Sequence, residues 1–443
     1  MPSPGNIART LKDSAVMRSF FITVFGSGLS KLILILSTFY CTHILSESEF
    51  GEFSFIRNTL NMVLCICALN FSSLCTKFTV DAKTSGESAF KLIILFLFSL
   101  FVCVVLGLVL LFLPKQLLFL IFKSDTVVFY FRIIGLLLPL FILQPLTEGV
   151  LRGMMRFKLI GLLQTLSSLL FFGAIVAGAR TAGYNGAVIG MLSYYALYAA
   201  VSVLFILKPI RSRRGAETLP GLLANRSVVR EMILPIFIMS FIEAPMFWLV
   251  QLLLIHFGDM TAIGGMTVIT QVRNLAILIP SYFFSTYLAY ASRLNAGREY
   301  DTYFNQFRRL RLCFIAAGGA VALLLTLTAT PLLKLYGAAY VSNSTQLVIA
   351  NLGIPFLLLS GLLRIELIIQ EHQKELLYIS VAWNLLWVAV LIPMLLLGVH
   401  SLTAFFTSQL LAIVFQYLLI HLIYQKDRKR LLRPHEDSDS TDR

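Results

Sequence analysis

The sequence predicts an all-α polytopic membrane protein with twelve transmembrane helices arranged in two similar halves. Of the 443 residues, 58% are apolar and only 13% are charged, whereas a soluble domain carries roughly 25% charged residues. Apolar runs of about 18 residues or more, the length that crosses roughly 30 Å of hydrocarbon, recur along the whole chain. A shift of 216 residues also lays the second half of the chain over the first.

The expected spans follow from these apolar runs. The first run is too long, and has the wrong flanks, for a cleaved signal peptide, so we expect it to be retained. The spans are expected at 18–45, 50–75, 89–113, 126–150, 159–181, 185–207, 231–257, 262–292, 308–333, 344–370, 376–398 and 402–425.

The repeat is visible at residues that are unusual inside apolar sequence. The shift that carries Arg57-Asn58 onto Arg273-Asn274 also pairs Lys77 with Arg293, Pro139 with Pro355 and Lys158 with Lys374. Each half therefore brings one arginine into a span. An ionisable residue in a membrane span is a functional hypothesis by default, and repeated halves with equivalent residues near the midplane are typical of transporters.

The charged residues outside the spans predict the topology. Most of the 36 basic residues lie near the N-terminus, in the even-numbered loops or in the C-terminal tail, which the positive-inside rule assigns to the cytoplasm. We therefore expect a multi-pass protein with both termini in the cytoplasm. Basic runs such as Lys208 to Arg214 then anchor the topology and contact anionic lipid, so the net charge of +14 does not indicate nucleic-acid binding.

The longest break in apolar density predicts the domain boundary. We expect an N-terminal lobe at 1–207, a cytoplasmic linker at 208–230 with four Pro and Gly residues, a C-terminal lobe at 231–425 and a cytoplasmic tail at 426–443. The six cysteines lie within spans or at their ends and are expected to be packing residues. No spacing of Cys or His predicts a metal site, and no nucleophile with a base predicts an enzyme.

Three segments carry a family resemblance. The chain starts with a first span that contains Gly26-Ser-Gly28, followed by Thr42 to Ser54. Two further matching segments are Gly149 to Lys158 and Leu335 to Tyr340. In this order the segments resemble bacterial polysaccharide transporters, the Wzx-type flippases for O-antigen and capsule repeat units. These belong to the multidrug/oligosaccharidyl-lipid/polysaccharide (MOP) exporter superfamily, whose lipid II flippases usually have fourteen spans rather than twelve.

The resemblance implies a fold, a function and a set of cavity residues. It implies two six-helix lobes around a central cavity that opens to each side in turn, and basic residues that line this cavity on the first, second and eighth spans. In this sequence those residues are Lys31, Arg57 and Arg273. Asn58 and Asn274 are candidates for hydrogen bonds to sugar hydroxyls. The function that the resemblance implies is flipping of undecaprenyl-pyrophosphate-linked oligosaccharide across the bacterial inner membrane, with membrane lipid and polysaccharide polymerase or other assembly proteins as partners.

The physical chemistry of the arginines fits a diphosphate substrate. A guanidinium makes planar, bidentate contacts with phosphate oxygens and stays charged when partly desolvated. The alternative is that Arg57, about seven residues or roughly 10 Å into its span, reaches the membrane surface or pairs with Glu49 or Glu52. Arg132 has Val348 as its counterpart, and there we favour contact with the membrane surface. Lys31 has Phe247 as its counterpart.

A second group of residues predicts coupling to a cation. Glu243 precedes Pro245 in the seventh span, and a proline frees a backbone carbonyl beside the carboxylate. Asn384, Thr403 and Thr407 add oxygen ligands of the kind that hard cations prefer. The coupling ion would be sodium or a proton; the alternative is a protonated glutamate at a kink or an ordinary ion pair. No other cofactor is expected.

One further pair predicts a gate. Glu148 corresponds to Arg364 under the same shift, so equivalent places in the two lobes carry opposite charges. An ion pair between them would help to close the cytoplasmic side, and the alternative is local pairing of Glu148 with Arg152.

The second functional hypothesis for the chain is a cation-coupled multidrug exporter, whose first-lobe cavity should be acidic rather than basic. A membrane-embedded glycosyltransferase or ligase lacks support, because no long loop carries an acidic pair.

Overall fold

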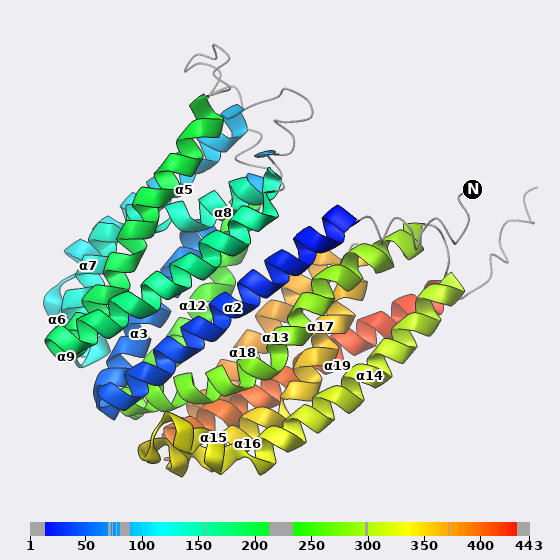
Figure 1. Cartoon of the computed structure of the whole chain (residues 1–443). Helices are drawn as coiled ribbons and strands as arrows, with labels where there is room; N and C mark the ends of the chain where they lie inside the picture. The colour runs from blue at the N-terminus through cyan, green and yellow to red at the C-terminus, as the bar shows by residue number, and fades with distance from the viewer. Residues whose placement is uncertain are drawn as a thin grey trace, which may run out of the picture. The chain divides into compact units, whose positions relative to one another are not determined.

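The protein is all helical in the part of the chain that the structure describes (Figure 1). This computed structural model describes residues 14–69, 72, 74–76, 78–79, 89–154, 156–211, 234–296, 300–370 and 372–431. Every regular element in these ranges is a helix. The expected all-α polytopic class is therefore confirmed. Lys77 and most of the expected 208–230 linker lie outside the described residues, as do residues 432–443 of the expected tail.

The chain divides into two compact units, Met1–Gly264 and Gly265–Arg443. The helices that lie in unit 1 are α2 (Ser14–Ile44), α3 (Glu47–Leu64), the π-helical turn η1 (Cys65–Leu69), α5 (Ala89–Phe112), α6 (Lys115–Phe122), α7 (Asp125–Phe141), α8 (Leu143–Gly153), α9 (Phe157–Arg211) and α12 (Leu234–Phe257). The next helix, α13 (Met260–Ala296), begins in unit 1 and continues into unit 2.

Unit 2 holds the rest of α13 and the helices that follow it. These are α14 (Tyr300–Leu327), α15 (Ala329–Tyr336), the 3₁₀ turn η3 (Ala338–Asn343), α16 (Ser344–Leu352), α17 (Ile354–Ile369), α18 (Gln373–Leu396) and α19 (Ser401–Leu431). In this unit α19 packs against α16, α17 and α18, and α14 packs against α16 and α17. In unit 1, α9 packs against α2, α7 and α8, and α5 packs against α7.

The helices lie over the spans expected from sequence, apart from the ninth span and the breaks within the fourth and tenth spans. The fifth and sixth spans form the two arms of α9, which meet at non-helical backbone at Ala182 and Gly183, between the bounds expected for these spans. Gly183 has φ of +55°, a conformation that glycine adopts without steric cost, so this residue supplies the turn between the two spans. The ninth span also begins earlier and ends earlier than expected, because α14 starts at Tyr300 and the chain turns at Thr328 into the short helix α15.

The size and surface of the helices fit a membrane protein. Seven helices of the described part of the chain are long and apolar enough to cross a bilayer, and one of them, Lys158–Ala199, contains both spans of the α9 hairpin. Large apolar side chains are widely exposed, including Phe101, Phe112 and Leu397. Exposure on this scale is unfavourable in water and is expected where the surrounding solvent is lipid.

The internal repeat is also present in the helices. Each unit inserts one eight-residue helix before its fourth span, α6 at Lys115–Phe122 and α15 at Ala329–Tyr336. Each unit then breaks its fourth span into two pieces, α7 and α8 in one case and α16 and α17 in the other. These shared irregularities do not follow from apolar periodicity alone, so they support the two-fold repeat independently of the arginines.

The described helix α12 packs within unit 1, where it contacts α3, α6 and η1. By sequence this helix is the first span of the second half. The predicted lobe boundary at 208–230 stays a prediction, since residues 212–233 lie outside the described part of the chain.

Candidate functional site

Arg57 is held on α3 by a well-defined helix start. Ser46 and Glu49 form a reciprocal capping box at the N-terminus of α3, which satisfies backbone N–H groups that a helix start leaves unpaired. Glu49 therefore serves the cap, and the other nearby acid, Glu52, accepts a hydrogen bond from Ser124 Oγ at 2.7 Å. The alternative pairing of Arg57 with these carboxylates is not observed.

The partners of Arg57 are uncharged groups. Its side chain is half-buried, and Nη1 donates a hydrogen bond to Thr38 Oγ1 on α2 at 3.0 Å. Cys41 and Tyr195 lie close enough for its charge to act on them. Among the described residues, no carboxylate forms an ion pair with this guanidinium. The described part of the chain thus provides no acidic counter-ion for Arg57.

Arg273 on α13 is more deeply buried and has the same kind of environment. Its side chain is 7% exposed, and Nη1 donates to Gln409 Oε1 on α19 at 2.6 Å. Nε finds no hydrogen-bond acceptor among the described residues, and none of their carboxylates forms an ion pair with it. A buried guanidinium with an unused donor is costly, and such a group is usually retained for binding.

Lys31 lies on the same face of α2 as Thr38, the partner of Arg57. The two residues are seven positions apart, which is close to two full turns or about 10 Å along the helix. The Lys31 side chain is exposed. The structure therefore brings Lys31 and Arg57 to one side of α2, in unit 1.

The two asparagines differ in their surroundings. Asn58 Nδ2 donates to Gln251 Oε1 of α12 at 2.9 Å, and the next residue, Thr59, accepts from Trp248 Nε1 at 2.9 Å. Asn58 therefore joins α3 to α12 through a fully buried glutamine. Asn274 is exposed on α13. A role for either residue in sugar binding stays a prediction.

The expected cation ligands are not joined by any observed contact. The side chain of Glu243 lies outside the described residues. Asn384 Nδ2 donates to Ser380 O, Thr403 accepts from Gln346 Nε2, and Thr407 is half-buried. No group of three or more His, Cys, Asp or Glu residues gathers in the described part of the chain. Coupling to sodium or a proton stays a prediction.

One buried acidic residue was not singled out by the sequence analysis. Glu366 on α17 has no exposed surface, and Tyr287 Oη donates a hydrogen bond to its Oε1 at 3.0 Å. A glutamate inside the tenth expected span was as visible as Glu243, so the signal that would have found it was present. The partners Gln251 and Gln409 were also missed, because an amide in an apolar run gives no sign of which arginine or asparagine it will reach.

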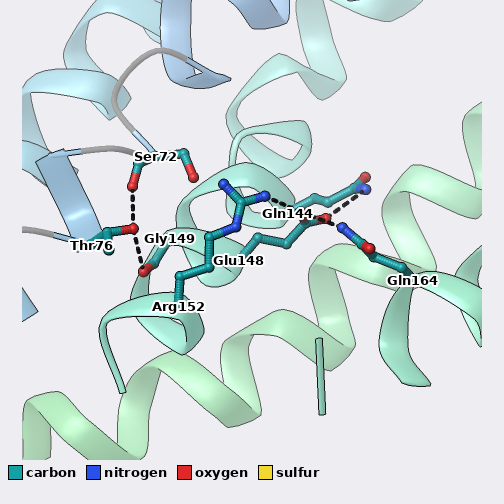
Figure 2. Close-up of polar contacts among 7 residues, drawn as sticks. All are labelled: Ser72, Thr76, Gln144, Glu148, Gly149, Arg152 and Gln164. Carbon is teal, nitrogen blue, oxygen red and sulfur yellow. Dashed lines mark hydrogen bonds and ion pairs between the residues drawn. The ribbon is translucent and has the colours of Figure 1, made fainter. Parts of the chain in front are cut away.

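Glu148 and Arg364, the residues of the expected gate, each contact neighbours in their own unit. Glu148 accepts hydrogen bonds from Gln164 Nε2 at 3.0 Å, Arg152 Nη2 at 3.3 Å and Gln144 Nε2 at 3.5 Å (Figure 2). Arg364 Nη2 donates to Ser380 Oγ at 3.0 Å. The local pairing of Glu148 with Arg152, weighed as the alternative, is therefore present. An ion pair between Glu148 and Arg364 stays a prediction.

Comparison with known proteins identifies the class of fold. The sequence matches no protein-family model and no curated protein. Its structure resembles an inward-facing multidrug resistance MATE family transporter of the MOP superfamily, with a TM-score of 0.73 and 13% identity over 90% of this chain and 96% of that one. The chain therefore has the fold of MOP superfamily transporters, and these structural neighbours are transporters rather than enzymes.

Two further solved structures show the same fold. A Vibrio cholerae MATE transporter has a TM-score of 0.57 and 16% identity, and a MOP superfamily transporter from Pyrococcus furiosus has a TM-score of 0.65 and 13% identity. Each comparison covers 94% of this chain and 96% of the other. The Pyrococcus protein is described as having a binding pocket of reversed polarity that suggests a different function.

Proposed function

We propose that the protein is a flippase that moves undecaprenyl-pyrophosphate-linked oligosaccharides across the bacterial inner membrane, with both termini in the cytoplasm. The observation that carries this proposal is the matched pair of arginines. Arg57 and Arg273 occupy equivalent positions in the repeat, and each is bound by a neutral hydroxyl or amide rather than by a carboxylate. The positive charge of both side chains therefore remains available to a diphosphate.

The sign of the charged side chains on α2 and α3 distinguishes this function from drug export. The three solved structures named above include a multidrug resistance transporter, so export of organic cations is the second candidate. An organic cation requires an acidic or aromatic site, whereas the face of α2 that carries Thr38 also carries Lys31, and the charged side chain of α3 that contacts Thr38 is Arg57. The reversed pocket polarity described for the Pyrococcus protein, which suggests a different function there, is a precedent for a change of pocket charge on this fold.

Reconstitution into liposomes tests the proposal directly. We expect the purified protein to flip a fluorescent undecaprenyl-pyrophosphate oligosaccharide and not to transport an organic cation such as ethidium. Arg57→Ala and Arg273→Ala should each abolish flipping, and the Lys variants should recover it only in part, because an ammonium lacks the planar fork. Arg132→Ala is the matched control: this half-buried arginine donates to the backbone carbonyl of Leu113, and its loss should leave flipping unchanged.

Two results would refute the proposal. Transport of ethidium with no flipping by the parent protein would make it a drug exporter. Full flipping by the double alanine variant, at equal protein content per liposome, would remove the arginines from substrate binding.

A further inference from the structure

The carboxylate of Glu148 lies in a setting made mostly of neutral amides (Figure 2). Its side chain is 14% exposed. Gln164 on α9 and Gln144 on α8 both direct their amide nitrogens to it. The charged partner, Arg152, lies one helical turn further along α8, is 44% exposed and forms an ion pair with Glu148 at 3.3 Å. Glu148 is thus positioned by contacts from both α8 and α9.

The same helix face connects Glu148 to the surroundings of Arg57. Phe141, Gln144 and Glu148 are spaced i, i+3 and i+7, which places them on one face, and the intervening Ile142 keeps near-helical backbone angles. The ring of Phe141 contacts the ring of Tyr195 on α9, with centroids 5.1 Å apart. The charge of Arg57 in turn acts on the hydroxyl of Tyr195.

We refer to these groups of unit 1 together as the polar track. It consists of Arg57, Tyr195, Gln144, Glu148 and Gln164. One end of the track is cationic, the middle is a half-buried aromatic ring with a hydroxyl, and the other end is a carboxylate between two amides. The two ends select different chemistry, because a carboxylate repels a phosphate and attracts hydroxyl groups.

We infer that the Glu148 end of the polar track is a carbohydrate-binding subsite. A carboxylate accepts hydrogen bonds from neighbouring sugar hydroxyls, the amides of Gln144 and Gln164 both donate and accept, and an aromatic ring packs against the apolar face of a sugar ring. This inference rests on the proposed function: the substrate places its diphosphate at Arg57 and extends its sugars along Tyr195 towards Glu148.

Binding measurements on the full-length protein in nanodiscs test the subsite. The probes are sugar-free undecaprenyl pyrophosphate and the same lipid carrying one N-acetylglucosamine, N-acetylgalactosamine, glucose or galactose. We expect at least one sugar-bearing lipid to bind the parent about tenfold more tightly than the sugar-free lipid, the gain that one or two hydrogen bonds provide. Glu148→Gln and Gln164→Leu should each remove this preference and leave the affinity for the sugar-free lipid unchanged.

A matched control is Glu52→Gln, which removes a partly exposed carboxylate in the same unit that is bound to Ser124 and lies outside the track. This variant should bind all five lipids as the parent does.

If the parent binds the sugar-free and all sugar-bearing lipids equally, the subsite is refuted while the proposed function stands. If the parent binds none of the five lipids, the proposed function fails. The inference is also overturned if Glu148→Gln weakens all five lipids alike. Recovery of flipping by Glu148→Arg combined with Arg364→Glu would likewise refute it, by assigning Glu148 to the gate.

Discussion

At the scale of single residues, the proposed function depends on two arginines in membrane spans, Arg57 and Arg273. Arg57 donates a hydrogen bond to a threonine and Arg273 to a glutamine. Neither guanidinium has a carboxylate partner among the described residues, so the desolvation of both charges is not offset by an ion pair there. A neutral hydroxyl or amide orients a guanidinium without neutralising its positive charge. Such an arrangement is poor for stability and suited to binding an anion.

Replacing Arg273 alone and together with its partner separates these two effects. Arg273→Met leaves the buried Oε1 of Gln409 unpaired and should destabilise the protein by about 1–3 kcal/mol. Combining it with Gln409→Leu replaces both polar partners by apolar groups, which we expect to restore or exceed the parent stability. Both variants should lose flipping. The measurement is the midpoint of thermal unfolding in detergent beside the flipping rate; a double variant less stable than the single one would contradict the argument.

At the scale of elements, the α9 hairpin depends on glycines where its two arms meet. A Cβ on Gly178 would run into the backbone carbonyl of Gly186 on the other arm. This close approach lets Tyr194 and Tyr195 on the second arm lie opposite the first arm and α7, where they contact Phe171 and Phe141. The packing of the hairpin thereby places Tyr195 in the polar track.

Substitution of these glycines tests the packing of the hairpin. Gly178→Val forces the arms apart and should cost about 1–3 kcal/mol, the usual cost of overpacking, while lowering flipping. Gly173→Val is the control on the same arm, because a Cβ there meets nothing within 4 Å. Unfolding midpoints of the two variants in detergent should differ clearly, and equal midpoints would contradict the proposed role of the contact.

Helix α12 is joined to α3 by polar contacts that must break if the two halves of the repeat separate during transport. The bonds are Asn58 to Gln251 and Trp248 to Thr59. Cysteines at Asn58 and Gln251, in a background without the six native cysteines, can be linked by a short thiol-specific reagent. We expect linkage to stop flipping and reduction of a cleavable linker to restore it.

The single cysteine variants treated with the same reagent provide the control for that experiment. Unchanged flipping by a fully linked protein would show that α12 stays on α3 throughout the cycle.

At the scale of the whole molecule, two acidic residues are candidates for coupling transport to an ion gradient. Unit 2 holds the buried acid Glu366, which accepts from Tyr287, and the sequence places Glu243 beside Pro245 in α12. A carboxylate that exchanges a proton or sodium ion during the cycle ties transport to that gradient, and glutamine keeps the shape of the side chain without the charge.

Gradient dependence in liposomes distinguishes the two acids. If Glu243 couples transport, Glu243→Gln should flip substrate at a rate that no longer responds to an imposed sodium or proton gradient, with substrate affinity unchanged. The same gradient measurement on Glu366→Gln provides the comparison with the buried acid of unit 2. A Glu243→Gln protein that responds to both gradients as the parent does would remove this residue from coupling.

Sequence alone determined the membrane class, the positions of the spans and the internal repeat. Apolar run length and loop charge are local properties of the sequence, and the bilayer's thickness and the positive-inside rule act on them without any tertiary contact. It also singled out Arg57 and Arg273, since a charge inside an apolar run is conspicuous without any fold. Only the tertiary structure decided which neutral side chains hold them, that α12 packs within unit 1, and that Gln144 and Gln164 both donate hydrogen bonds to the carboxylate of Glu148. These facts depend on helix rotation and on contacts between residues far apart in the chain, and a uniformly apolar span carries no periodicity that fixes its rotation.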